Sequence, residues 1–234
     1  ASFLMERGVT SVSVNVNVSR TNVILGEKTR VIGGKNAIEE QIGPLTFTIS
    51  PTSFFQVNPV QTERLYQTAL EMVELIGNEV VWDAYCGAGT ISLFLAQKAK
   101  QVYGVEIVEA AVRNAWENAA KNGMDNVKFY VGKAEQVIPE HFRRTGIRPD
   151  VIVVDPPRAG CDEALLHTIL EMKPDRMVYV SCDPGTLARD LRFLGKGGME
   201  VREVRCIDMF PETGHVETVC LLTREKSVKS YAYV

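Results

Sequence analysis

Cys182 is the residue of this sequence whose position best suits covalent chemistry. It follows an apolar run over 176–181 that predicts a strand, and Asp183-Pro184 comes next, with Asp at the cap and Pro at the first position of an expected helix. A helix amino terminus lowers the pKa of a nearby thiol and makes the sulfur a better nucleophile. The alternative is a buried thiol that packs as a small hydrophobic side chain, the commoner fate of a free cysteine.

A second set of residues suits the binding of a small cofactor. Residues 81–90 run from an expected strand into an expected helix, and Gly87 and Gly89 would let the backbone turn sharply and approach a ligand closely. Glu106 ends the next strand, 19 positions after Gly87. That is about the spacing at which an acidic residue can bind the two hydroxyls of a ribose.

The pattern around these glycines argues against a dinucleotide. The glycines form GxG without the third glycine of GxGxxG, and Asp83 would repel a pyrophosphate. S-adenosylmethionine has no phosphate and carries two cationic groups, a sulfonium and an ammonium. A carboxylate beside the loop therefore favours this cofactor, and the alternative is a tight turn with a solvated acid.

Two further segments could complete a reaction site. Asp155-Pro156-Pro157-Arg158 follows an apolar run over 150–154, at the end of a strand where open α/β sheets bind ligands. The prolines stiffen this loop. Asp155 could hold the cofactor or a base edge and Arg158 a phosphate, although a surface arginine is an equal alternative for Arg158. Glu217 lies in the last apolar run, where the pattern alone favours an exposed edge position over a positioned base.

Alternating strands and helices would position these residues. Apolar residues recur at helical spacing from Leu65 to Ile76, and Gly77 is expected to end that helix. Strands are then predicted at 79–84, 101–106, 127–131, 150–154 and 176–181, and helices near 90–98, 108–122, 134–142, 162–172 and 184–194. Strands 199–207 and 216–223 have no helix between them and predict an antiparallel hairpin at one edge of a mostly parallel sheet. The expected fold class is therefore α/β, Rossmann-like, with a carboxyl-terminal hairpin.

Residues 1–49 differ from the rest. Positions 12–18 alternate apolar and polar side chains, which predicts a half-exposed strand, and Leu45 to Ile49 predicts another. This β-rich meander is too short to bury a good core alone. We therefore divide the chain into a small β-rich segment, 1–49, and a cofactor-binding domain, 50–234. The absence of an initiator Met suggests a fragment of a longer protein, and the first residues lack the basic stretch and apolar run expected of a secretory signal.

Composition excludes several classes of protein. The 234 residues are 45% apolar and 24% charged, an ordinary globular balance, and no stretch reaches the ~20 apolar residues that span a bilayer. Five cysteines form no CxxC pair, which argues against a disulfide framework or a metal site and indicates a reducing cytoplasm. The other four are expected to be packing residues: Cys86, Cys161, Cys206 and Cys220. The net charge of −3 is a mild argument against a nucleic-acid partner.

Together these segments resemble the TrmA/RumA family of RNA 5-methyluridine methyltransferases, over residues 45–225. As a whole, the amino-acid sequence is most similar to those of Gram-positive enzymes that modify 23S ribosomal RNA. Five motifs carry the resemblance, in the family's order: Phe54-Phe55-Gln56-Val57-Asn58, Asp83 to Gly89, Asp155 to Arg158, Ser181-Cys182-Asp183-Pro184 and His215-Val216-Glu217-Thr218.

The resemblance implies roles for individual residues. Cys182 would attack C6 of a flipped uridine, and Glu217 would remove the C5 proton. The resemblance assigns no RNA contact, but by residue type and position Arg158 could hold an RNA phosphate and Asp155 a base edge. Residues implied or expected to hold S-adenosylmethionine are Gln56, Asp83, Tyr85, Gly87, Thr90, Glu106 and Asp155; some relatives have Asn where this chain has Thr90.

The resemblance leaves the RNA undecided between 23S ribosomal RNA and transfer RNA. Full-length relatives often carry an oligonucleotide-binding domain and a four-cysteine iron–sulfur motif, neither of which is in this sequence. Three other hypotheses stand beside it: an NAD-dependent oxidoreductase, a non-catalytic binding module, and an enzyme that methylates an adenine amino group, which needs no thiol.

Overall fold

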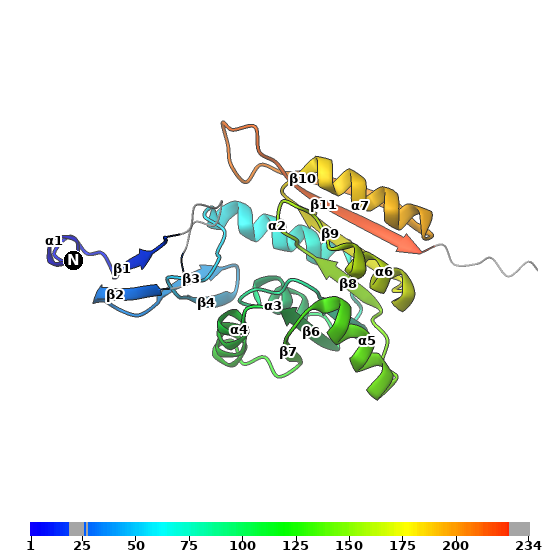
Figure 1. Ribbon diagram of the computed structural model, residues 1–234, viewed down its shortest axis with the longest axis horizontal. Helices are drawn as coiled ribbons and strands as arrows, with labels where there is room; N and C mark the ends of the chain where they lie inside the picture. Colours follow the sequence, from blue (N-terminus) through cyan, green and yellow to red (C-terminus); the bar gives the residue numbers. More distant parts are fainter. Residues whose placement is uncertain (19–25, 27, 225–234) are drawn as a thin grey trace, which may run out of the picture.

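The computed structural model describes residues 1–18, 26 and 28–224. A seven-stranded sheet forms its centre (Figure 1). Its strand order is β10 (Met199–Ile207), β11 (Glu217–Arg224), β9 (Arg176–Ser181), β8 (Val151–Val154), β5 (Val80–Asp83), β6 (Gln101–Glu106) and β7 (Val127–Val131). The five strands β5 to β9 run parallel, and β11 is antiparallel to both of its neighbours. The predicted α/β, Rossmann-like fold with a carboxyl-terminal hairpin is confirmed.

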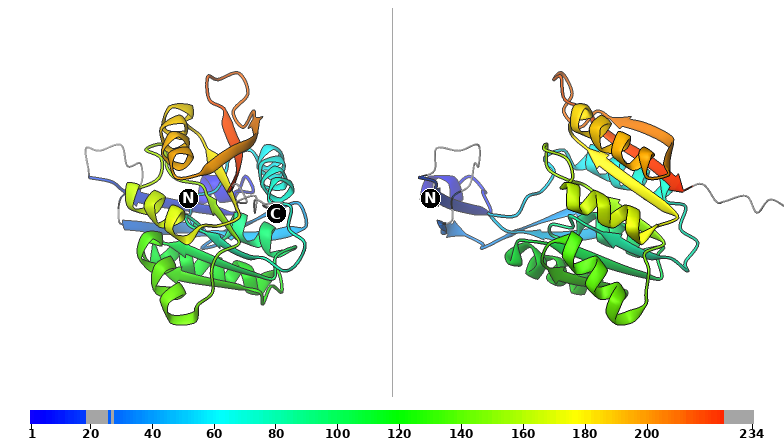
Figure 2. Two further views of the ribbon diagram at one scale, coloured as in Figure 1. Left: turned by 90° about the vertical axis from the view of Figure 1, so that its right-hand side faces the viewer. Right: turned by 45° about the vertical axis from the view of Figure 1, so that its right-hand side comes forward.

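Helices cover both faces of this sheet, as the two views of Figure 2 show. One face packs against α2 (Pro59–Met72), α3 (Thr90–Ala96) and α4 (Glu109–Lys121), the other against α5 (Ala134–Thr145), α6 (Glu163–Met172) and α7 (Pro184–Lys196). Strand β8 shows why its sequence is apolar throughout. Val151 and Val153 pack into the first layer, and Ile152 and Val154 pack into the second.

The hairpin corrects the interpretation of Glu217 as an exposed edge residue. Strand β11 pairs with β9 on one side and with β10 on the other, so β10 forms the edge and β11 is an interior strand. The Glu217 side chain is accordingly only 4% exposed. A local pattern cannot distinguish these cases, because it does not say which strand of a hairpin pairs with the sheet.

Helix α2 ends at Met72, earlier than the predicted end near Ile76. The guanidinium of Arg176 donates hydrogen bonds to the carbonyls of Val73 and Glu74, which satisfies acceptors at the helix end. The Glu79 carboxylate then accepts hydrogen bonds from the amides of residues 76–78. These contacts, distant in sequence, end the helix while its apolar spacing continues.

The amino-terminal part forms two separate antiparallel pairs instead of one meander. A short helix α1 (Ser2–Met5) precedes the pair β1 (Ser11–Val16) and β2 (Lys28–Gly34), which stands away from the main sheet (Figures 1 and 2). The second pair, β3 (Ile38–Ile42) and β4 (Leu45–Ile49), packs on α4, and Phe47 is fully buried there. The division of the chain at residue 49 stays a prediction. Among the described residues, every helix is too short or too polar to cross a lipid bilayer.

Candidate active site

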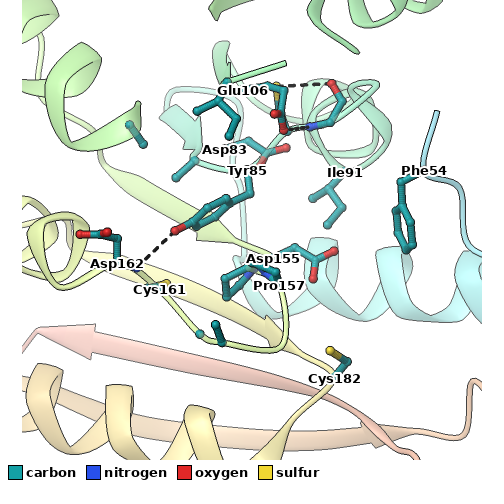
Figure 3. Close-up of a pocket in the computed structure, with 18 of the residues that line it drawn as sticks. Phe54, Asp83, Tyr85, Ile91, Glu106, Asp155, Pro157, Cys161, Asp162 and Cys182 are labelled. Carbon is teal, nitrogen blue, oxygen red and sulfur yellow. Dashed lines mark hydrogen bonds between the residues drawn. The ribbon is translucent and has the colours of Figure 1, made fainter. Parts of the chain in front are cut away.

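A cavity of about 1370 Å³ lies where the parallel strands end. Figure 3 shows Tyr85, Asp155 and Cys182 following one another around it, each from a different loop. The structure brings all ten of the predicted site residues to this cavity: Gln56, Asp83, Tyr85, Gly87, Thr90, Glu106, Asp155, Arg158, Cys182 and Glu217. Their individual roles stay predictions.

The two glycines of the β5–α3 loop are needed for different reasons. Both adopt left-handed backbone conformations, with φ of +51° at Gly87 and +82° at Gly89. A Cβ on Gly89 would lie 3.1 Å from side-chain atoms of Ala115 and Phe129, whereas a Cβ on Gly87 would meet nothing within 4 Å. Gly89 therefore allows close packing of α3 on its neighbours, and Gly87 leaves open space in the wall of the cavity.

Glu106 stands at the end of β6, directly beside this loop (Figure 3). One carboxylate oxygen accepts a hydrogen bond from the Gly87 amide at 3.3 Å, and the other accepts from the Val108 amide at 2.9 Å. These bonds fix the orientation of the carboxylate. Each oxygen keeps a lone pair for a further donor, so Glu106 can accept from a ligand hydroxyl.

Asp83 is fully buried at the end of β5. Its Oδ2 accepts a hydrogen bond from the Ser92 hydroxyl at 2.6 Å, while Oδ1 has no hydrogen-bond partner among the described residues. Burial raises the pKa of Asp83 to about 6. A buried carboxylate with an unused oxygen suits a cationic group of a ligand, and the alternative of a solvated acid is excluded.

Three more side chains surround the expected cofactor space. The Tyr85 hydroxyl accepts a hydrogen bond from the Asp162 amide at 3.4 Å, and the Tyr66 hydroxyl donates one to Thr90 Oγ1 at 3.1 Å. Gln56 is 9% exposed, and nothing in the described part of the chain hydrogen bonds to it. Its amide is thus available to a ligand, whereas Tyr85 and Thr90 are held by the protein.

Cys182 and Glu217 meet at the other end of the cavity. The antiparallel register pairs Thr218 of β11 with Ser181 of β9. The next pair of opposite positions at this end of the two strands is therefore Glu217 and Cys182. Asp183 accepts a hydrogen bond from the Thr186 amide at 2.9 Å, and the predicted helix start at Asp183-Pro184 is confirmed. Cys182 is partly exposed, not sealed in the core, which favours the nucleophile over the packing hypothesis.

The electrostatics of Cys182 differ from the sequence prediction. Partial burial raises the pKa of its thiol, and the carboxylates of Glu217 and Asp155 raise it further, whereas Arg158 lowers it. The predicted lowering by the helix amino terminus is therefore outweighed. In the ligand-free protein the thiol is the dominant form near neutral pH, and added positive charge in the cavity would favour the thiolate.

Both carboxyl groups beside the thiol are harder to ionise than usual. Burial raises the pKa of Asp155 to about 8, and the charges of Glu217 and Asp83 add to this effect. Burial also raises the pKa of Glu217, although Arg158 opposes the rise. Arg158 itself is exposed and lines the cavity. The site is therefore short of positive charge, which is what a cationic ligand would supply.

The other four cysteines lie in different environments. Cys86, Cys161 and Cys220 are buried, as expected of packing residues. Cys206 is exposed on the edge strand β10, so the expectation that it packs is wrong. Exposed and half-buried residues alternate along this part of β10, and Cys206 takes an exposed position. The alternation of side chains expected for a strand could have suggested this. No group of three or more potential metal ligands occurs within residues 1–18, 26 and 28–224.

The chain is similar to proteins of a known family. The family model described as tRNA (Uracil-5-)-methyltransferase matches residues 19–225. The chain belongs to this family. S-adenosylmethionine is the methyl donor of the family. Membership of the family therefore confirms the predicted cofactor. Membership of the family also decides against the NAD-dependent oxidoreductase.

Relatives in this family share most of the present sequence. An RNA methyltransferase from Oceanobacillus iheyensis is 58% identical over 94% of this chain and 48% of its own length, and one from Halalkalibacterium halodurans is 60% identical over 92% and 46%. The chain therefore spans about half the length of these relatives. The crystal structure of Pyrococcus abyssi tRNA (uracil-54, C5)-methyltransferase with S-adenosyl-L-homocysteine superposes with a TM-score of 0.75 at 33% identity, over 92% of this chain and 51% of that one.

The cavity fits the donor used by the family. The unpartnered oxygen of Asp83 and the carboxylate of Glu106 offer acceptors for an ammonium and a ribose, and the open space at Gly87 allows close approach. Gln56 adds an unengaged amide. When bound, S-adenosylmethionine would supply an activated methyl group and positive charge.

Three residues that the sequence did not reveal also shape the site. Tyr66 orients the Thr90 hydroxyl, Ser92 orients Asp83, and Asp190 is fully buried next to the loop that follows β8. Tyr66 and Ser92 occupy ordinary buried helix positions and carried no signal. Asp190 lies between Leu187 and Leu194 on the apolar side of α7, and an acid in such a stripe could have been noticed.

Proposed function

We propose that this chain is the catalytic part of an enzyme that transfers a methyl group from S-adenosylmethionine to C5 of uridine in RNA. One observation carries the proposal: Cys182 directly follows β9, Glu217 begins the neighbouring strand β11, and both line the same cavity as the residues expected to hold the cofactor. A module that only binds its ligand needs no such pair, and methylation of an adenine amino group needs no thiol.

The proposed chemistry follows from the weak nucleophilicity of uracil C5. Cys182, as the thiolate, adds to C6, and the electron pair displaced from the C5–C6 double bond makes C5 nucleophilic. Arg158 favours the thiolate electrostatically, because it is the cation that lowers the Cys182 pKa. C5 would then take the methyl group, and the donor sulfur would keep the electron pair of the broken S–CH3 bond and leave as a neutral thioether. Glu217 next removes the C5 proton, the double bond forms again, and the Cys182 thiolate leaves. The raised pKa of Glu217 makes it a stronger base than an exposed glutamate.

The target uridine must leave its base stack to reach Cys182, because C6 is inaccessible in a stacked strand. An unpaired RNA loop meets this requirement at least cost. Arg158 is exposed at the edge of the cavity and suits a phosphate of that loop, while Asp155, behind it, suits either the cofactor or a base edge. Free cysteines and an RNA substrate support a cytoplasmic location for the enzyme.

We propose 23S ribosomal RNA as the substrate, on the similarity of the sequence to Gram-positive enzymes of that specificity. Transfer RNA is the second candidate. It is favoured by the solved Pyrococcus abyssi enzyme, whose substrate is a tRNA uracil. The fold does not distinguish the two, since both substrates would present a flipped uridine to the same cavity.

Mass mapping of RNA tests the function and the substrate together. Full-length enzyme and S-adenosylmethionine are incubated with undermethylated ribosomal and transfer RNA, and the modified nucleotides are mapped by mass spectrometry. We expect 5-methyluridine in 23S RNA with the parent enzyme and with the control Cys206→Ser, and none with Cys182→Ser. Methylation confined to transfer RNA would establish the second candidate. Methylated adenine, or full activity of Cys182→Ser, would refute the proposal.

A further inference from the structure

Asp190 on α7 is a buried acid that the proposed chemistry does not use. Its side chain is 0% exposed. Oδ2 accepts hydrogen bonds from the Tyr179 hydroxyl at 2.6 Å and from the Cys161 amide at 2.8 Å, and Oδ1 accepts from Arg189 Nε at 2.8 Å. Both oxygens are therefore engaged by the protein, and Asp190 is not available to a ligand.

The first two turns of α7 hold the loop between β8 and α6 at several points. The Thr186 hydroxyl donates a hydrogen bond to the carbonyl of Arg158 at 3.0 Å, and Arg189 Nη2 donates one to the carbonyl of Ala159 at 2.9 Å. Asp190 receives the amide hydrogen bond described above and also orients Arg189. Backbone groups of three loop residues are thus bound by side chains of one helix.

The contact is close enough to require a glycine. Gly160 adopts a φ of +80°, and a Cβ there would lie 2.5 Å from Arg189 Nη2 and 2.7 Å from Asp190 Oδ2. Its amide closes a turn on the Pro157 carbonyl at 2.8 Å. The loop therefore has one tight conformation while these side chains hold it.

This contact joins the two segments that form the reaction end of the cavity. The β8–α6 loop carries Asp155 and Arg158 (Figure 3 shows its path past Cys182), and α7 begins directly after Cys182. The charged groups that act on the Cys182 thiol are Glu217 from β11 and both of these loop residues. Arg158 is the group among them that favours the thiolate, so its distance from the sulfur matters most.

We propose that Asp190, with Arg189 and Thr186, is a positioning residue that fixes the β8–α6 loop on α7 and thereby holds Arg158 beside Cys182. An amide at position 190 cannot replace the carboxylate. One of its two polar atoms is a donor, and it would face either the Cys161 amide or the Arg189 guanidinium, both of which are donors. The role of this contact in methylation rests on the function proposed above, but its effect on the thiol does not.

The test measures the reactivity of Cys182 without RNA or methyl donor. The full chain is alkylated with iodoacetamide from pH 6 to pH 10, and the Cys182 peptide is quantified by mass spectrometry at each pH. In Asp190→Asn the loop loosens and Arg158 moves away, so we expect the pH profile to move upward by about half to one unit. Alkylation at pH 7.5 then becomes about three- to tenfold slower.

Glu79→Gln is the matched control, because Glu79 is also a buried carboxylate that binds backbone amides and an arginine, at the opposite end of the sheet. It should leave the Cys182 profile unchanged. Should Asp190→Asn not fold, Thr186→Val removes one hydrogen bond to the loop from a half-buried position and should also slow alkylation. An unchanged profile in the folded variant, or an equal shift in Glu79→Gln, would overturn the proposal. Loss of uridine methylation alone would not.

Discussion

Asp83 should destabilise the ligand-free protein at neutral pH, and its replacement by asparagine should reveal this. The carboxyl has a pKa of about 6 when folded, against an ordinary value of 3.8. At about 1.4 kcal/mol per unit, ionising it in the folded protein costs about 3 kcal/mol above pH 6. Because the folded pKa is the higher one, this cost is absent below pH 4 and grows as the pH rises from 4 to 6.

Asparagine carries no charge and can still accept the hydrogen bond of Ser92 through its carbonyl oxygen. At pH 8 we therefore expect Asp83→Asn to raise the free energy of unfolding by up to about 3 kcal/mol, and at pH 4 to change it little. The same variant should bind S-adenosylmethionine about ten- to a hundredfold more weakly, because the ammonium loses a charged acceptor. Urea unfolding followed by circular dichroism, and titration calorimetry, measure the two effects.

Glu79→Gln provides a control of opposite sign. Burial would raise the pKa of Glu79, but the amides of residues 76 and 78 and the Arg176 guanidinium together hold it below its usual value. Its charge therefore stabilises the fold above the ordinary pKa, and this contribution is lost as the pH falls. Glu79→Gln should lower stability at pH 8.

If Asp83→Asn were no more stable than the parent at pH 8, the Asp83 carboxylate would have to be well solvated or paired, and the argument for a cationic ligand there would fail.

Two further variants separate reaction from packing. Glu217→Gln should still form the bond between Cys182 and uridine C6 and accept the methyl group, but it should accumulate an RNA–protein adduct that denaturing gels detect; free product at the parental rate would contradict the proposed role of Glu217. Gly89→Ala should lower stability more than Gly87→Ala. Both variants put alanine at a positive φ that it disfavours, but only a Cβ at position 89 comes within 3.1 Å of neighbouring atoms. Equal unfolding midpoints of the two variants would contradict this.

Much of the sheet could be predicted because parallel strands covered on both faces leave an unmistakable apolar run. The bounds predicted for the parallel strands β6, β7 and β9 agree with the structure at both ends, and so do those of the antiparallel edge strand β10. Ends set by distant groups were not predictable. Helix α2 ends just before two carbonyls, of Val73 and Glu74, that accept hydrogen bonds from Arg176, and no residue of the helix indicates that partner.

The candidate site could be predicted as a set of strand-end residues, but not as a set of charges. Carboxyl ends of parallel strands converge, so Asp83, Glu106, Asp155 and Cys182 had to come together. The burial of Glu217 depends on β11 lying inside the sheet, and this is a property of strand order. The raised pKa of Cys182 likewise depends on two carboxylates from other segments, which sequence spacing cannot place near the sulfur.

Covalent trapping on 5-fluorouridine RNA tests the central claim most directly. Fluorine at C5 cannot be removed as a proton is, so the adduct between enzyme and methylated base persists. With S-adenosylmethionine present, we expect a denaturation-resistant complex whose peptide map carries the nucleotide on Cys182, formed equally well by Cys206→Ser and absent in Cys182→Ser. A nucleotide attached to any other residue, or uridine methylation that proceeds without a covalent complex, would contradict the assignment of this sulfur as the nucleophile.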